Sequence, residues 1–167
     1  MNPSIWFRLV EELHQFRESF IVAPRLWEDY GPPSGLTWNK VDFEPSSKTI
    51  LPPAKGLYAM TIRARNPDFP PASYLFYVGQ VGASGSPDRT FPVRFQDYLN
   101  EYSRIKRPKV ARFLHKYKGH IDFYYCVLDH LIVDIGALEK RMITALLPMA
   151  NTSDIEPSIS AARRAFS

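Results

Sequence analysis

Two runs of strand-forming residues, separated by a proline-rich turn, constrain the fold of this chain most strongly. Residues 56–64 and 74–81 are rich in β-branched and aromatic side chains, which favour strands. The segment between them, RNPDFPPAS, is typical of a loop because it contains Pro, Asn and Asp. Two strands joined in this way predict an antiparallel hairpin.

Further patterned segments follow and precede this hairpin. Residues 120–128 predict a third strand because they are mostly aromatic and apolar. Apolar spacing and proline positions predict helices at five places: residues 3–20, after Pro92, after Pro108, residues 135–147 and residues 159–166. This order predicts an α+β fold, with a small three-stranded antiparallel or mixed sheet flanked by helices.

The N-terminal part of the chain differs in composition from the rest. Residues 21–54 contain six prolines, which disfavour long regular elements. The helix before them has an apolar stripe that we expect to pack on the core, with a dimer seam as the alternative: Ile5, Leu9, Leu13, Phe16 and Phe20. We therefore divide the chain into a packed helix and arm (1–53), a central module (54–153) and a C-terminal tail (154–167).

Composition excludes several classes of protein. The single cysteine, Cys126, rules out an internal disulfide and a cysteine-based zinc cage. No apolar run approaches the roughly 18 residues of a membrane span, and the first residues lack the pattern of a signal peptide. The sequence has no GxxxxGK[ST] motif, so a P-loop is excluded. We expect a cytoplasmic protein without a membrane partner.

Positive charge is concentrated in one stretch. Residues 85–120 carry nine Lys and Arg against three Asp and Glu, a surplus of +6 in a chain whose net charge is +4. A local positive field of this kind favours a polyanionic partner. A solvated basic face is the alternative interpretation.

Two tyrosines occupy related places in the predicted hairpin. Tyr58 and Tyr77 lie in neighbouring strands, each close to a glycine. Alternate side chains of a strand share a face, so a matching register would place the two phenols side by side. A cross-strand aromatic pair that only packs is the alternative.

The triplets that contain these tyrosines resemble a known signature. GLY at 56–58 and YVG at 77–79 are similar to the two triplets of the GIY-YIG nuclease family. Arg94 in the following helix, Glu139 in the later helix and Asn151 beyond it resemble the remaining motifs of that family, in the same order. The resemblance covers residues 54–153, which is about the size of the family's catalytic module.

The resemblance implies a metal-dependent DNA endonuclease that hydrolyses phosphodiester bonds. It implies Tyr58 as general base, Glu139 as the ligand of Mg²⁺ or Mn²⁺, and Arg94 on the scissile phosphate, with Tyr77 supporting water or phosphate. One carboxylate suits Mg²⁺, which takes one or two protein carboxylates and keeps several waters. Only about one phenol in a thousand is ionised at neutral pH, so we expect Arg94 and the cation to lower the pKa of Tyr58.

The same resemblance assigns the remaining site residues. Asn151 is expected to tie the site together by hydrogen bonds, and Gly79 to leave room for the close approach of backbone or DNA. Tyr98 stands where the family often carries a histidine, and it can donate to a phosphate. The segment between the triplets has 18 residues, which is longer than usual in the family.

The basic stretch then has a role as a DNA-binding surface. The residues expected to bind substrate phosphates are Arg104, Lys106, Arg107, Lys109, Arg112 and Lys116. Phosphate contacts give affinity that depends on salt and carries no base sequence information.

Two other functions stay open at this point. A non-catalytic nucleic-acid-binding protein could use the same scaffold, and a protein-interaction module could use the aromatic, proline-rich arm. The sequence leaves the oligomeric state open. Two nicks in duplex DNA would need two active sites, as a homodimer would supply, or two visits by one site.

Overall fold

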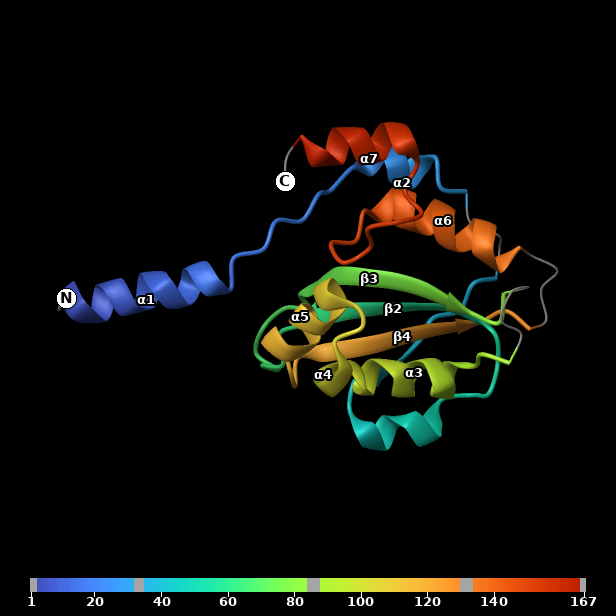
Figure 1. Ribbon diagram of the computed structural model, residues 1–167, viewed down its shortest axis with the longest axis horizontal. Coiled ribbons are helices and arrows are strands. Elements are labelled where there is room, and N and C mark those ends of the chain that lie inside the picture. Colours follow the sequence, from blue (N-terminus) through green and yellow to red (C-terminus); the bar gives the residue numbers. More distant parts are fainter. Residues whose placement is uncertain (1–2, 32–34, 84–87, 130–133, 166–167) are drawn as a thin grey trace.

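A computed structural model describes residues 3–31, 35–83, 88–129 and 134–165 of the chain. The helices are α1 (Pro3–Gln15), α2 (Pro24–Glu28), α3 (Phe91–Leu99), α4 (Glu101–Arg104), α5 (Pro108–Lys116), α6 (Ile135–Leu146) and α7 (Pro157–Arg164). The strands are β1 (Asn39–Asp42), β2 (Gly56–Arg63), β3 (Ser73–Val81) and β4 (Ile121–Val127), and η1 (Pro45–Ile50) is a 3-10 helix. The α+β class predicted from the sequence is confirmed (Figure 1).

The sheet has four strands in the order β1-β4-β2-β3, and every pair is antiparallel. The expected number of three strands is therefore wrong. The additional strand is β1, which comes from the proline-rich arm and pairs with β4 through Asn39↔Tyr125 to Asp42↔Asp122. Only Val41 of its four residues is even partly buried. The arm and the central module thus share one sheet.

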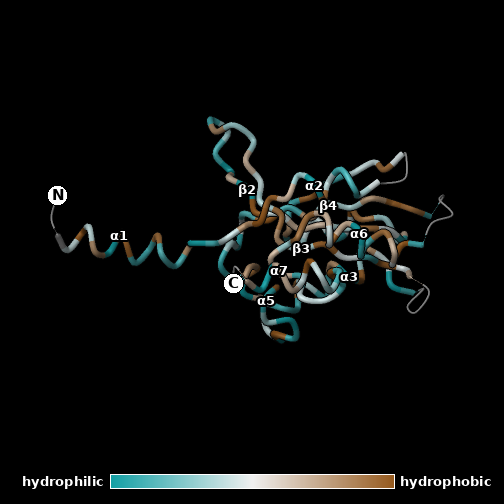
Figure 2. The backbone as a smooth tube through the Cα atoms, turned by 90° about the horizontal axis from the view of Figure 1, so that it is seen from above, coloured by the Kyte–Doolittle hydropathy of each residue, from teal (hydrophilic) through white to brown (hydrophobic). Residues whose placement is uncertain are grey.

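Half of the long segment between the two signature triplets is strand. β2 runs to Arg63 and β3 begins at Ser73, so the connection itself spans only residues 64–72. The register shifts between Met60 and Thr61, which marks a β-bulge in the hairpin. The connection projects from the end of the sheet in Figure 2.

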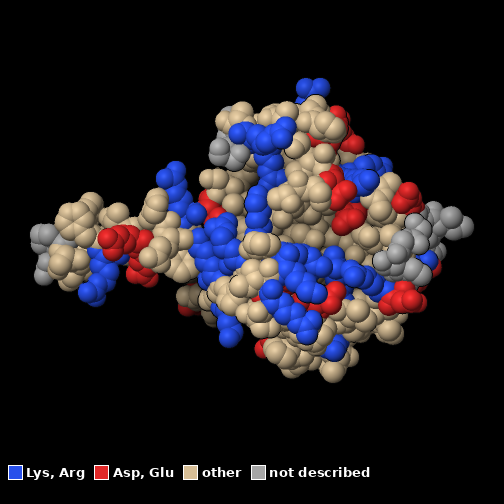
Figure 3. Space-filling view, in the orientation of Figure 1, with Lys and Arg blue, Asp and Glu red and all other residues tan. Residues whose placement is uncertain are grey.

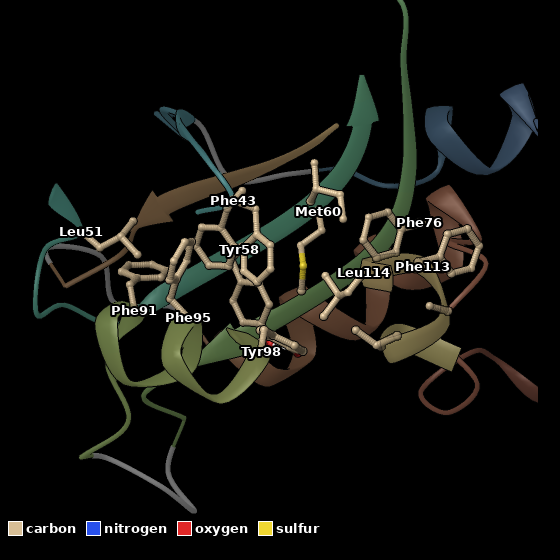
Figure 4. Close-up of a cluster of buried hydrophobic side chains, with 14 of the residues drawn as sticks. Phe43, Leu51, Tyr58, Met60, Phe76, Phe91, Phe95, Tyr98, Phe113 and Leu114 are labelled. Atoms are coloured by element: carbon tan, nitrogen blue, oxygen red, sulfur yellow. Dashed lines mark hydrogen bonds between the residues drawn. The ribbon is translucent and has the colours of Figure 1, made fainter. Parts of the chain in front are cut away.

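Helices cover both faces of the sheet. α3 and α5 pack on the face that carries Tyr58, Phe76 and Phe123, where the largest core cluster lies (Figure 4), and η1 packs against α3 and β1. α6 lies on the other face, against Leu57 and Val78, and α2 packs on α6 (Figure 1). Side chains alternate between these layers because neighbouring residues of a strand point to opposite faces.

α1 does not pack on the core, which corrects the expectation for the apolar stripe of this helix. Its large apolar side chains from Ile5 to Leu13 are 43% to 62% exposed, and the helix extends away from the body in Figures 1 and 2. The physical reason is that α3, α5 and α6 already cover the two faces of the sheet. The rest of the arm does lie against the core, where Phe43 and Leu51 are buried.

Candidate active site at the β3 edge

The candidate residues converge on β3, which ends the strand order of the sheet. An outer strand lets helices from the two faces approach each other beside it. α3 carries Arg94 on one face and α6 carries Glu139 on the other, while β2 and β3 supply Tyr58 and Tyr77. These two helices are separated by β4 in the sequence, so only the fold brings them together.

Tyr58 and Tyr77 lie side by side on one face of the sheet. The register pairs Tyr58 with Gly79 and Met60 with Tyr77, so the two tyrosines are diagonal neighbours. Their ring centroids are 6.2 Å apart, with the ring planes inclined by 31°. Tyr58 also stacks on Phe123 of β4 at a centroid distance of 5.2 Å.

The hydroxyl of Tyr58 is enclosed by two partners. It accepts a hydrogen bond from Nε of Arg94 at 2.9 Å and lies 2.7 Å from the hydroxyl of Tyr98. Both tyrosines are fully buried. Tyr98, which takes the place of the family's histidine, therefore covers Tyr58 instead of facing a substrate.

Burial raises the pKa of Tyr58 far above its ordinary value. The neighbouring Tyr77 raises this pKa further, and the positive charge of Arg94 opposes the rise without overcoming it. Arg94 alone therefore does not lower the pKa of Tyr58, and the lowering expected from Arg94 and the cation together stays a prediction. A buried phenol that keeps its proton cannot take one from water.

Gly79 leaves room for Tyr58 and not for DNA. A Cβ atom at this position would overlap the hydroxyl oxygen and the ring of Tyr58. The expectation that Gly79 permits the approach of DNA is thus corrected: the space is already filled by a side chain of the site. Glycine is required here for side-chain packing, at an ordinary strand position.

Two guanidinium groups flank the ring of Tyr98. The guanidinium carbon of Arg94 lies 5.4 Å from the ring centroid and that of Arg107 lies 5.1 Å from it. Nη1 of Arg94 is buried without a hydrogen bond, although a carboxylate oxygen of Asp97 is 3.7 Å away. An unsatisfied buried donor of this kind is where an anionic group of a ligand would be stabilised.

Glu139 lies in a cavity of about 440 Å³ beside these groups. The side chains that line the cavity include Tyr77, Arg107, Lys109, Glu139, Asn151 and Asp154. Burial raises the pKa of Glu139 to about 7, and the negative charge of Asp154 adds to this rise while Arg94 and Lys140 oppose it. The carboxyl of Glu139 thus titrates near neutral pH.

The carboxylates of this cavity suit a hard divalent cation. Glu139 and Asp154 repel each other, and a cation between them would relieve that repulsion. Within the part of the chain that the structure describes, no three His, Cys, Asp or Glu side chains form a group that could hold an ion. Mg²⁺ needs only one or two protein carboxylates because water completes its shell, so the donor set fits.

Asn151 holds the free edge of β3. Its side chain accepts a hydrogen bond from the backbone N–H of Val78 at 2.9 Å and donates one to the carbonyl of the same residue at 2.8 Å. The N–H of Ala150 donates to the carbonyl of Phe76 at 2.8 Å. The loop after α6 therefore pairs with β3 as a short strand would, and it fixes the wall of the cavity.

Arg163 of α7 supports the same loop. Its guanidinium donates to the backbone carbonyls of Asn151 at 3.1 Å, Pro148 at 3.0 Å and Met149 at 3.2 Å. No sequence pattern singles out Arg163, because its partners are backbone carbonyl groups, which every residue carries. A helix in the C-terminal tail thus braces the site.

The six basic residues expected to bind phosphate divide into two groups. Arg112 and Lys116 pair with Glu18, whose carboxylate lies 3.0 Å from Arg112 and 2.6 Å from Lys116. Burial would raise the pKa of Glu18, but hydrogen bonds from these two residues lower it. The one carboxylate of Glu18 compensates only one of these two positive charges, so phosphate binding by this pair stays a prediction.

The other four basic residues are arranged around the cavity. Arg107 and Lys109 line it, while Arg104 at the end of α4 and Lys106 in the connection before α5 are exposed. Figure 3 shows Lys and Arg side chains gathered across this face of the molecule. The basic surface is thus continuous with the cavity that holds Glu139.

Glu101 and Asp154 were also missed by sequence reasoning. Glu101 is a buried acid that binds Arg107, and Asp154 lies in the loop after α6. Glu101 is one of three acids in the basic stretch, and no local pattern distinguishes it from the other two. No family model matches the chain, and neither a curated protein nor a solved structure matches it.

Proposed function

We propose that this protein is a metal-dependent endonuclease that hydrolyses phosphodiester bonds in DNA at the edge of β3. The observation that carries the proposal is the convergence of Tyr58, Tyr77, Arg94 and Glu139 from four separate elements. Their order along the chain is that of the GIY-YIG nucleases, which the two triplets resemble. Cleavage of a phosphodiester requires charge stabilisation and an oriented water, and both kinds of group are present.

Arginine and tyrosine side chains would hold the phosphate and the water. Arg94 has an unsatisfied Nη1, and Arg107 lies on the other side of Tyr98 at the cavity wall. Guanidinium groups suit phosphate oxygens because they donate parallel hydrogen bonds. The hydroxyl of Tyr77, which lines the cavity, would orient the water or the phosphate.

Tyr58 has two roles in this proposal, in sequence. In the described state its hydroxyl fixes the orientation of Arg94 through the bond at 2.9 Å. Tyr58 could take the proton of the attacking water only as a phenolate, so it must first lose its own proton to solvent, and Tyr98, whose hydroxyl lies 2.7 Å away in the buried pair, must leave first. Substrate binding that displaces Tyr98 would thus switch Tyr58 from a positioning to a catalytic role.

Glu139 would hold the cation, with Asp154 beside it. Bound Mg²⁺ or Mn²⁺ supplies charge stabilisation to the phosphate and the leaving oxygen. Since the pKa of Glu139 is raised to about 7, cation binding at neutral pH must displace a proton. Affinity for the cation should therefore increase as the pH rises through 7.

Non-catalytic nucleic-acid binding is the second candidate, and the full burial of Tyr58 and Tyr98 favours it. A chain in which Tyr98 never moves would keep the basic surface and the cavity but lack a usable base. For a protein-interaction role of the arm the burial is divided, because Phe43 and Leu51 are buried in the core whereas Val22 and Trp27 are 66% and 46% exposed.

The experiment is a nicking assay on supercoiled plasmid with titrated Mg²⁺ and Mn²⁺. We expect the wild type and Glu28→Ala, an exposed glutamate of α2 outside the cavity, to nick DNA. Glu139→Ala should lower the rate by about 100-fold or more, since a metal ligand is lost. Salt-dependent DNA binding without nicking by the wild type would reject the nuclease and support the second candidate.

A further inference from the structure

Ile105 has a backbone conformation that its side chain does not favour. Its φ is +46°, in the left-handed region, where a β-branched residue is strained. Leu147 has the same φ, but its side chain is 6% exposed and packs in the core. Ile105 is 56% exposed, so burial does not offset the strain there. The contrast points to a function for an isoleucine at this position.

A buried carboxylate holds the loop that carries Ile105. Glu101 accepts a hydrogen bond from the backbone N–H of Arg107 at 3.0 Å and another from its guanidinium at 3.2 Å. Glu101 is itself almost fully buried. Since these bonds span Ile105, they close the turn between α4 and α5 and keep the isoleucine outward. Strained residues persist where the surrounding contacts fix them in this way.

The neighbours of Ile105 are suited to a nucleic-acid backbone. Arg104 and Lys106 flank it and are exposed, and Arg107 lines the cavity that holds Glu139. The basic band in Figure 3 lies over this part of the molecule. An exposed apolar side chain thus stands at the centre of a cationic loop, beside the candidate active site.

We propose that Ile105 is a wedge that enters between two base pairs of duplex DNA next to the cleaved bond. Arg104 and Lys106 would contact the phosphates on either side of the unstacked step. Apolar side chains, isoleucine among them, separate base steps in this way in proteins that kink DNA. The proposal rests on the proposed function and narrows its substrate to duplex DNA with a deformable step, such as a pyrimidine–purine step.

The test uses duplexes that carry 2-aminopurine, whose fluorescence increases on unstacking, without divalent cations so that no cleavage occurs. We expect the wild type to increase the fluorescence and Ile105→Gly to abolish most of the increase. Ile105→Gly should also weaken duplex binding by about tenfold, because the deformed step is no longer stabilised. Its binding to single strands should be unchanged.

Two further variants separate a wedge from a merely strained turn. Ile105→Gly should have a higher melting temperature than the wild type, because glycine adopts a positive φ without strain. Ile50→Ala, a control at an isoleucine that is 65% exposed on η1, should unstack DNA as the wild type does. Ile105→Met keeps an apolar wedge and should retain the signal.

The outcomes distinguish this proposal from the proposed function. Unstacking by the wild type without nicking would keep the wedge and reject the nuclease. Nicking with no unstacking, or with Ile105→Gly behaving as the wild type, would overturn the wedge alone. Equal unstacking of an RNA duplex would overturn the assignment to DNA.

Discussion

The two sides of the β3 edge differ in how far their side chains are exposed. On the α3 side, Tyr58 and Tyr98 are buried, Arg94 is partly buried, and Tyr58 is hydrogen-bonded to both of the others. On the α6 side, Glu139 and Asp154 face a cavity, and the pKa of Glu139 is raised to about 7 by burial first and then by Asp154. The difference teaches that motif residues need not all meet the substrate. The buried side fixes geometry, and the open side offers groups that can change their protonation or bind a cation.

The largest expected effect is on the buried side, at Gly79. Gly79→Val should reduce the free energy of unfolding by about 3–5 kcal/mol, because its side chain would overlap Tyr58, which Phe123 blocks from behind. Urea denaturation measures the change. Gly136→Ala is the control, since a Cβ there approaches only a carboxylate oxygen of Asp134 at 3.4 Å. Equal stability of Gly79→Val and wild type would show that the tyrosine side is not tightly packed.

Removal of the Tyr58 hydroxyl should have the next largest effect. Tyr58→Phe leaves Nε of Arg94 and the hydroxyl of Tyr98 without this partner, which should cost about 1–3 kcal/mol of unfolding free energy. Tyr98→Phe removes only one of the two bonds and should cost less. Chemical denaturation of both variants gives the comparison. A Tyr98→Phe loss as large as that of Tyr58→Phe would contradict the central position of Tyr58.

Glu139 should show a smaller effect that depends on pH. Because its folded pKa is about 7 and its unfolded pKa is about 4.5, the folded protein binds more protons between these values. The free energy of unfolding of the wild type therefore falls as the pH rises through this range, and this decrease is complete above pH 7. Glu139→Gln cannot ionise and should exceed the wild type in stability at pH 8 by on the order of 2 kcal/mol, and hardly at all at pH 4.

Thermal unfolding at pH 4 and pH 8, without divalent cations, measures this difference. Mg²⁺ at pH 8 should stabilise the wild type and not Glu139→Gln, since only the carboxylate binds the cation. A stability difference that does not vary with pH would mean that Glu139 titrates normally. The α6 side would then lack the carboxyl group with a raised pKa that distinguishes it from the α3 side.

The smallest expected effect concerns α1, the most exposed element of the molecule. Deletion of residues 1–15 should change the unfolding free energy by less than about 1 kcal/mol, because the large apolar side chains of α1 are exposed. Phe43→Ala, at a buried residue of the same arm, should cost about 3–5 kcal/mol. Calorimetry of the two variants provides the measurement. A large decrease in the free energy of unfolding on deletion of α1 would support the packing of this helix on the core that its sequence predicted.

Local sequence patterns predicted most of the fold. They failed where an element's structure depends on pairing with another strand or where its contacts decide its position. β2, β3 and β4 carry their own strand signal, whereas β1 has four residues and depends on β4 for its structure. The apolar stripe of α1 was found by its periodicity, but a periodic pattern does not reveal what the stripe contacts. No membrane-spanning helix was expected, and within the described ranges no helix has the length and apolarity to cross a bilayer.

The order of the motifs predicted which residues form the site, but it could not predict which of these residues are exposed. The burial of Tyr58 depends on Tyr98, 40 positions away, and on the space left by Gly79. The pairing of Arg112 and Lys116 with Glu18 depends on a contact across more than 90 positions. Contacts between residues so far apart in the sequence leave no local pattern, so these features are visible only in the folded structure.

The most direct measurement of the central claim is to locate a bound cation by NMR. Trace Mn²⁺, which broadens nearby signals, should first broaden those of Tyr77, Glu139 and Asn151 at the cavity. The effect should disappear in Glu139→Gln and persist in Glu28→Ala. Broadening centred elsewhere, for example at Asp42 and Asp122, or unchanged broadening in Glu139→Gln, would contradict a metal site at the edge of β3.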